Sequence, residues 1–266
     1  VSLQTWANGP IRSVGLRGGG AVPPRWGNRS IQLRDRGCVR RADGTVECWV
    51  ASYGAYRISG VSHVAMARAA SWWCGLDVAG KVFCQEGPLR HFAHDASALQ
   101  RVTELVGAGE HFCALHEKGV SCWGYNPYGG LGALSDEAGT RPVAVVGLPR
   151  VVKLGGGYWH TCAVDERGGV WCWGRNAEGQ LGNRARTLRQ PTAVRVAGVT
   201  DAVAVTAGLH HSCALRKGGT VVCWGANTAG EFGNGRPPEA LAAVVGLTEL
   251  GKLSPGQHQT YALRRA

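Results

Sequence analysis

Pairs of cysteines nine or ten positions apart enclose a short turn at several places along this chain. In the clearest copies, which begin at Cys113, Cys162 and Cys213, the second cysteine leads into a Trp-Gly-x-Asn motif. Weaker copies begin at Cys38 and Cys74, so the pattern accounts for all 10 cysteines of the chain. The pairs are Cys38/Cys48, Cys74/Cys84, Cys113/Cys122, Cys162/Cys172 and Cys213/Cys223.

A further copy of the pattern is divided between the two ends of the chain. It begins as "YALRRA" at Tyr261 and continues in the opening residues "VSLQTWANG", where Thr5 and Tyr261 stand at the two cysteine positions. The first positions of successive copies lie 36 to 51 residues apart, and the six copies together span all 266 residues. A repeat with its halves at opposite termini indicates an array that closes on itself, because an open solenoid needs capping repeats.

Each repeat contains short, β-branched segments punctuated by glycine, and none of them sustains a helical period. In the last complete copy, strands are expected over 190–198, 199–208, 211–217 and 220–227. We therefore expect an all-β fold, a six-bladed β-propeller of four-stranded antiparallel blades in which the N-terminal strand completes the last blade. The predicted domain is 1–266, with blade hairpins near 38–49, 74–84, 113–123, 162–173 and 213–224, and 261–266 joined with 1–6.

Composition agrees with one globular domain, since 44% of the residues are hydrophobic. No apolar run approaches the length of a membrane span. Because the chain opens inside an expected strand, we interpret its start as the product of processing or trimming. We expect a monomer.

The pattern "GxxHxCAL…VxCWGxNxxGxxG" resembles the repeat of the regulator-of-chromosome-condensation propellers, in a cysteine-bearing form common in bacterial secreted proteins. The resemblance is strong from Gly107 to Leu263 and looser before it. Related propellers serve as a Ran nucleotide-exchange factor, a plant UV-B photoreceptor and a bacterial β-lactamase inhibitor. The resemblance therefore implies the fold but not one function. Those relatives have seven blades, whereas six repeats are counted here.

The cysteine pairs have three interpretations. Opposite positions of an antiparallel hairpin bring Cα atoms within disulfide reach. Free cysteines would instead serve as small buried hydrophobes, and zinc is disfavoured because the pairs lack the short spacing of structural sites. Disulfides are favoured because Tyr261 and Thr5 replace both members of the sixth pair together. Oxidised pairs would place the protein in an extracellular or periplasmic compartment.

Three histidines recur two positions before a first cysteine, which raises the question of a site in the central funnel. A hydrogen-bonding role between blades is the favoured interpretation, and a metal or catalytic site is the alternative. No catalytic or phosphate-binding motif accompanies them, so we expect no cofactor, no metal and no enzymatic activity. The funnel candidates are His111, His160, His211 and Gln259.

The repeat is irregular over 6–36, 50–73 and 85–109, where aromatic and basic residues accumulate. Irregular loops on a rigid scaffold are common carriers of binding, although drift of redundant blades is an equal alternative. The motif tryptophans Trp123, Trp173 and Trp224 are expected in the core. The predicted partner-binding residues are Arg36, Tyr53, Tyr56, Trp72, Trp73, Arg90, His91 and Phe92.

The formal net charge is +11, and eight arginines lie within residues 1–41. This excess favours a protein partner with an acidic surface, a polyanion or an anionic envelope. The alternative is a solvated loop, and nucleic acid is disfavoured by the extracellular cysteine chemistry.

Three functions remain open on these grounds. The favoured hypothesis is a secreted or periplasmic binding propeller that recognises a protein, with inhibition as one form of that role. The first alternative is an enzyme or small-ligand binder with a site in the funnel. The second is a nucleotide-exchange or chromatin role, which the family resemblance implies.

Overall fold

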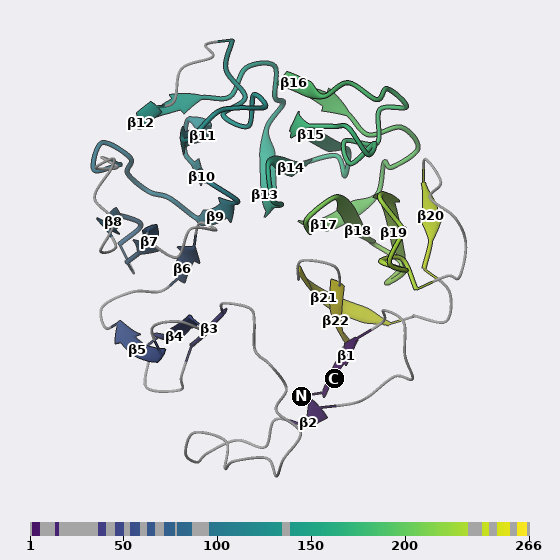
Figure 1. Ribbon diagram of the computed structural model, residues 1–266, viewed down its shortest axis with the longest axis horizontal. Helices are drawn as coiled ribbons and strands as arrows, with labels where there is room; N and C mark the ends of the chain where they lie inside the picture. Colours follow the sequence, from purple (N-terminus) through teal and green to yellow (C-terminus); the bar gives the residue numbers. More distant parts are fainter. Residues whose placement is uncertain are drawn as a thin grey trace.

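The described strands form six antiparallel sheets, and Figure 1 shows them arranged around a common centre. All-β structure with antiparallel sheets is thus confirmed. The computed structural model describes residues 2–5, 14–15, 37–40, 46–50, 54–58, 63–66, 72–77, 79–86, 96–134, 139–233, 241–244, 249–255 and 260–264.

Three consecutive sheets have four strands each, and in each sheet the chain runs from the innermost to the outermost strand. The first comprises β9 (Glu104–Ala108), β10 (His111–His116), β11 (Gly119–Gly124) and β12 (Gly139–Ala144). The second comprises β13 (Val151–Gly156), β14 (His160–Asp165), β15 (Val170–Arg175) and β16 (Arg189–Arg195). The third comprises β17 (Ala202–Ala207), β18 (His211–Arg216), β19 (Val221–Gly225) and β20 (Ala242–Ala243).

Two sheets nearer the N-terminus have three described strands each. One contains β3 (Gly37–Arg40), β4 (Val46–Val50) and β5 (Gly54–Ile58). The other contains β6 (His63–Met66), β7 (Trp72–Leu76) and β8 (Val82–Glu86).

The remaining sheet joins the two ends of the chain. Its order is β2 (Val14–Gly15), β1 (Ser2–Thr5), β22 (Thr260–Arg264) and β21 (Leu250–Pro255). Thr5 lies directly opposite Tyr261 in the pairing of β1 with β22. The divided repeat therefore pairs as the sequence predicts, with these two residues at the positions that cysteines occupy elsewhere.

In four of the sheets, a disulfide joins the second strand along the chain to the third. The bonded cysteines are cross-strand partners with Cα atoms 4.0 to 4.1 Å apart. Cys38 and Cys48 are also directly opposite each other in the pairing of β3 with β4. The bonds present are Cys74–Cys84, Cys113–Cys122, Cys162–Cys172 and Cys213–Cys223.

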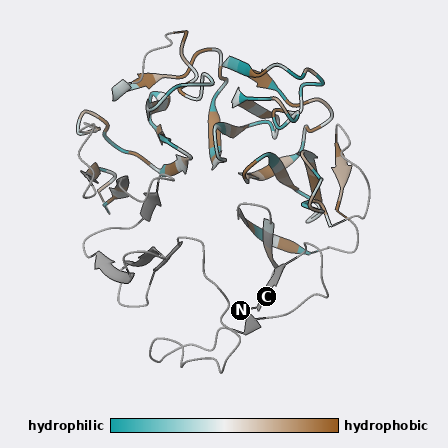
Figure 2. Ribbon diagram, viewed as in Figure 1, coloured by the Kyte–Doolittle hydropathy of each residue, from teal (hydrophilic) through white to brown (hydrophobic). Residues whose placement is uncertain are grey.

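The hydrophobic cores lie between neighbouring sheets. Trp224 of one sheet packs in a cluster with Cys162, Cys172 and Leu181 of the preceding sheet. Figure 2 shows hydrophobic residues on the inner strands and a largely hydrophilic outer strand β16. The motif tryptophans Trp123, Trp173 and Trp224 are completely buried, as predicted.

Each glycine that follows a motif tryptophan allows a close approach of backbone. Gly174 has φ of 103°, and a Cβ there would lie 2.4 Å from the carbonyl oxygen of Trp159. A side chain at this position would force the loop before β14 away from the sheet. The described part of the chain contains no helix with the length and hydrophobicity of a membrane span.

Removing one disulfide should destabilise the protein without changing its fold. The double substitution Cys162→Ala and Cys172→Ala should lower the free energy of unfolding by about 2–3 kcal/mol, because a closed loop is released in the unfolded chain. Chemical denaturation without a reducing agent measures the difference. An unchanged free energy, or equal stability of the parent protein with and without reductant, would contradict the assignment.

Candidate protein-binding surface

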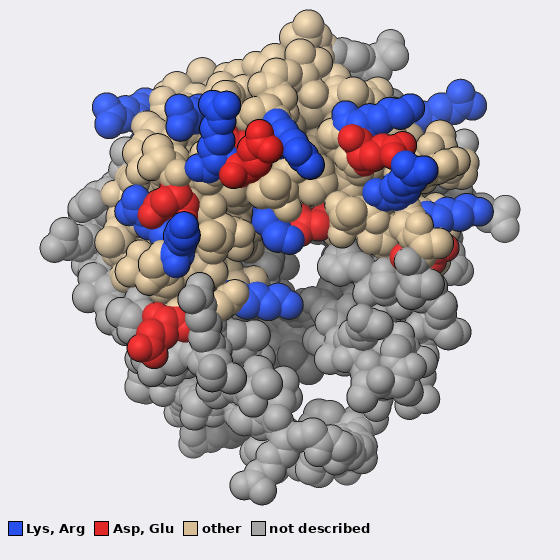
Figure 3. All heavy atoms as spheres, turned by 180° about the vertical axis from the view of Figure 1, so that it is seen from behind, with Lys and Arg blue, Asp and Glu red and all other residues tan. Residues whose placement is uncertain are grey.

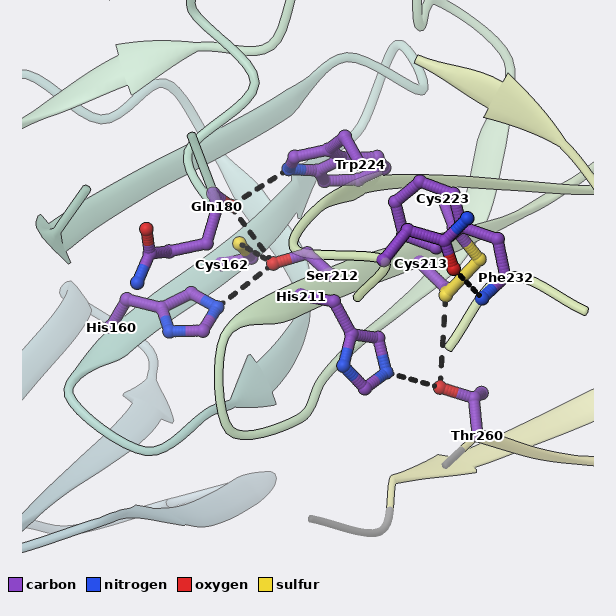
Figure 4. The surroundings of a disulfide bond; sticks show 11 residues. His160, Cys162, Gln180, His211, Ser212, Cys213, Cys223, Trp224, Phe232 and Thr260 are labelled. Atoms are coloured by element: carbon purple, nitrogen blue, oxygen red, sulfur yellow. Dashed lines mark hydrogen bonds between the residues drawn. A yellow bond between two sulfur atoms is a disulfide. The ribbon is translucent and has the colours of Figure 1, made fainter. Parts of the chain in front are cut away.

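The three repeated histidines join four successive sheets, each to the next. His111 Nε2 lies 2.9 Å from Thr161 Oγ1, and His160 Nε2 lies 2.9 Å from Ser212 Oγ. His211 Nε2 lies 3.0 Å from Thr260 Oγ1. Figure 4 shows the last two contacts, in which each hydroxyl also approaches a disulfide sulfur of the preceding sheet.

Burial keeps the imidazoles of His111 and His160 neutral. Desolvation lowers the pKa of both His111 and His160 to about 3. His160 is also surrounded by His211, His111, His210 and Arg175, each of which lowers its pKa further. The neutral rings therefore serve as hydrogen-bonding groups at ordinary pH, as the favoured interpretation predicts.

The structure places the histidines between sheets and not among the residues that line the central channel. The described residues include no group of His, Cys, Asp or Glu arranged to hold a metal ion. Gln259, the fourth funnel candidate, lies outside the described residues.

The channel has a volume of about 740 Å³ and lies along the inner strands β9, β13, β17 and β21. Its described lining is mainly apolar side chains and backbone, and it contains one carboxylate, Glu104. That carboxylate lies 2.6 Å from Lys153 Nζ and accepts a hydrogen bond of 2.7 Å from the backbone N–H of Leu154. The one carboxylate of the described lining is therefore already engaged, and the lining also includes the side chain of Lys252.

Several partner-binding residues expected from the sequence lie outside the described residues, namely Arg36, Tyr53, Arg90, His91 and Phe92. The others lie on described strands. Tyr56 is opposite Cys48 in the pairing of β4 with β5, and Trp72 and Trp73 are opposite Glu86 and Gln85 in that of β7 with β8.

A cluster of aromatic rings lies on the loops that precede β14 and follow β11. The rings of Tyr158 and Trp159 stack with centroids 4.9 Å apart, and Trp159 also contacts Tyr128 at 4.5 Å. The rings of His210 and Tyr158 are nearly perpendicular, with centroids 6.4 Å apart. All four side chains are partly buried, so the aromatic cluster is held in place while part of its surface stays accessible to solvent.

Arg175 connects this cluster to the end of β15. Its guanidinium carbon lies 5.7 Å from the centre of the Tyr128 ring, and its Nη2 lies 2.8 Å from Glu178 Oε1. Its Nη1 lies 2.9 Å from His210 Nδ1. Because a guanidinium only donates, His210 Nδ1 accepts this hydrogen bond and the imidazole proton resides on Nε2. These contacts fix the arginine and the aromatic rings as one unit.

Sequence reasoning missed this cluster because its members come from three different repeats. The available signal was "GYWHT", in which Tyr158 and Trp159 stand between the motif residues Gly157 and His160. The next repeat has Leu209 and His210 at the same two places.

The opposite ends of the strands carry ion pairs. There, Arg101 pairs with Glu117 at 2.6 Å and Arg216 pairs with Asp201 at 2.7 Å. Figure 3 shows acidic and basic side chains interspersed on this face around the central opening. Such exposed pairs contribute little to stability, and the aromatic cluster lies at the other ends of the strands.

The sequence matches the Regulator of chromosome condensation (RCC1) repeat over residues 119–164 and 167–215, and over 151–180 and 202–231 with a second form of it. Protein pim1 of Schizosaccharomyces pombe is 29% identical over 164 residues, which cover 58% of this chain and 30% of pim1. The Protein RCC2 homolog of Danio rerio is 32% identical over 153 residues, which cover 56% of this chain and 28% of that protein. The chain therefore spans under a third of either relative.

Two solved structures share the fold. Prp20p from Saccharomyces cerevisiae superposes with a TM-score of 0.71 at 16% identity, over 87% of this chain and 67% of Prp20p. Human WBSCR16 gives a TM-score of 0.69 at 17% identity, over 90% of this chain and 74% of that structure. At these identities the likeness establishes the β-propeller architecture alone.

The buried histidines should make stability depend on pH. Their folded pKa lies below the ordinary value of 6.5, so the unfolded chain binds more protons between about pH 6.5 and 3. The free energy of unfolding should therefore fall as pH decreases through this window, by roughly 1 kcal/mol per pH unit for each histidine. Chemical denaturation at a series of pH values measures this slope.

His160→Gln is the variant that tests this, because the divided repeat already has a glutamine, Gln259, at the position that corresponds to His160. This variant should flatten the slope by the share of one histidine. Ser212→Ala, which removes the hydroxyl partner but keeps the titratable ring, should retain a steep slope. An unchanged slope in His160→Gln would exclude the neutral buried histidine as its cause.

Proposed function

Because residues 119–164 and 167–215 match the repeat of the regulator-of-chromosome-condensation propellers, we propose that the chain is a non-enzymatic binding propeller that recognises a protein partner. The observation that carries this proposal is the aromatic cluster of Tyr128, Tyr158, Trp159 and His210 with its attached Arg175. Tyrosine, tryptophan and arginine are the residues that most often dominate binding energy at protein interfaces.

The packing of the aromatic side chains against one another supports a role of the cluster in binding. Stacking holds Trp159 between Tyr158 and Tyr128 before any partner arrives. A side chain that is already ordered loses little conformational freedom on binding. The scaffold behind it consists of motif residues that are buried and hydrogen-bonded, so the exposed part of the rings is available for contact.

We also propose that the six repeats form one closed domain over residues 1–266. The pairing of β1 with β22 supports closure, because it completes a sheet from both ends of the chain. A closed ring of this kind needs no second copy to cover an open edge, so the proposed state is a monomer.

The proposed location is extracellular or periplasmic. Its support is the set of four disulfides, since such bonds persist in oxidising compartments. An inhibitory role is a narrower version of the proposal, and the compared proteins give no support to the resemblance with β-lactamase inhibitors. The irregular segments with Tyr53, Trp72 and Trp73 are proposed as a second contact region.

The two alternatives have weaker support. A funnel enzyme would need reactive groups in the channel, where the described carboxylate of Glu104 is already paired with Lys153. An exchange or chromatin role rests on what is stated of relatives, such as the binding properties of Prp20p to Gsp1p and histones.

Affinity capture with quantitative mass spectrometry tests the proposal on secreted and cell-envelope extracts of the source organism. A partner enriched by the parent protein should be captured at least tenfold less by Trp159→Ala, because a central aromatic anchor is lost. Val203→Ala, which alters an exposed apolar residue of the channel, should leave capture unchanged.

The control for folding is thermal unfolding of each variant with its disulfides intact. A combined Tyr53, Trp72 and Trp73 alanine variant measures the contribution of the irregular segments. No partner enriched by the parent protein, or capture lost in Val203→Ala but kept in Trp159→Ala, would refute the proposal and direct attention to the channel.

A further inference from the structure

The loop between β15 and β16 projects two exposed arginines beside the aromatic cluster. Arg184 and Arg186 lie in this loop, and both side chains are exposed. The loop leaves the sheet just after Arg175, which contacts Tyr128. It returns at Arg189, the cross-strand partner of Arg175.

Hydrogen bonds hold the loop in place. Asn176 Nδ2 donates to the carbonyl oxygen of Ala185 at 2.9 Å and to Asn183 Oδ1 at 3.1 Å. Asn183 Oδ1 also accepts a hydrogen bond of 3.2 Å from the backbone N–H of Ala185. Because Ala185 stands between Arg184 and Arg186, these bonds fix the backbone from which both arginines extend.

The loop has an excess of positive charge. Arg184 and Arg186 form no ion pair with any residue that the structure describes. The nearby carboxylate of Glu178 is already paired with Arg175. On the opposite face, by contrast, arginines such as Arg216 have acidic partners. The loop therefore carries positive charge that the described surface does not balance.

Arg184 also occupies a costly backbone conformation. Its φ is 63°, in the left-handed region that glycine adopts most easily. The same place in the next repeat, after the shared Gly-Asn, is Gly235. A large charged residue at this position does not help the loop to fold, which is consistent with a role in binding.

Exposed apolar side chains accompany the charge. Leu188 is 60% exposed and Tyr125 is 47% exposed. Leu188 is anchored near Arg175 because its carbonyl oxygen accepts a hydrogen bond of 3.4 Å from the N–H of Asn176. Apolar contacts and arginines thus occur together on this surface.

We infer that this surface binds an acidic segment of the protein partner, with carboxylates on Arg184 and Arg186 and an apolar side chain on Leu188 and Trp159. Arginine suits this occupant because its planar guanidinium matches carboxylate geometry. This inference rests on the proposed protein-binding function and assigns that function a partner chemistry and a binding loop.

The test is selection of a random-peptide display library on the disulfide-intact protein. Enriched peptides should combine Asp or Glu with aromatic or aliphatic residues. Their affinity, measured by fluorescence anisotropy on synthetic copies, should fall as salt increases. It should also fall about five- to tenfold in the double variant Arg184→Gly and Arg186→Gln, which loses two charged contacts.

A matched control removes the same charge elsewhere. Arg150→Gln with Arg167→Gln alters exposed arginines at the other end of β15 and should leave peptide affinity unchanged. The Arg184→Gly change should not lower thermal stability, because glycine relieves the left-handed conformation. Loss of binding in the loop variant therefore cannot be ascribed to unfolding.

Three results would overturn the inference: no enriched peptide, enriched peptides without acidic residues, or equal loss of affinity in the loop and control variants. None of them would by itself refute the proposed function, which depends on capture of a folded partner through Trp159. Retained capture by the loop variant together with lost capture by Trp159→Ala would support protein binding while rejecting the acidic segment.

Discussion

Hydrogen bonds between successive sheets are the interaction on which the rest of this structure depends. Three consecutive sheets each contribute a buried imidazole that meets a hydroxyl of the next sheet, as His160 meets Ser212. The motif indole of Trp224 adds a second bond, 2.8 Å long, to the carbonyl oxygen of Gln180 in the preceding sheet. Since a buried polar group without a partner is costly, these bonds select one way of stacking the sheets.

The disulfides connect different parts of the fold from these hydrogen bonds. They join strands within a sheet, whereas the imidazole and indole bonds join one sheet to another. The two systems meet at Ser212, which lies 3.7 Å from Cys162 Sγ and also donates to the carbonyl oxygen of Gln180. Because the motif residues are engaged in this way, the proposed partner recognition is assigned to residues that differ from repeat to repeat.

The residue after the motif Trp-Gly shows this difference between constant and variable positions. After the motif Trp-Gly, successive repeats carry Tyr125, Arg175 and Ala226. The following asparagine makes one hydrogen bond that is the same in all three repeats, for example when Asn176 Oδ1 accepts the N–H of Leu181 at 3.0 Å. The constant residue builds the loop while the variable residue sets its surface. The aromatic cluster and the basic loop both arise at such variable positions.

The amino-acid sequence alone predicts the repeat, the short antiparallel strands, the cysteine pairing and the pairing of the divided copy. These features depend only on local spacing and cross-strand register. The sequence also predicts the burial of Trp173 and the hydrogen-bonding role of His111 between sheets. It does not predict the aromatic cluster, since Tyr128, Trp159 and Arg175 belong to successive repeats and meet only when sheets stack. Which charges are neutralised is likewise a property of the folded chain, because partners such as Lys153 and Glu104 are far apart in sequence.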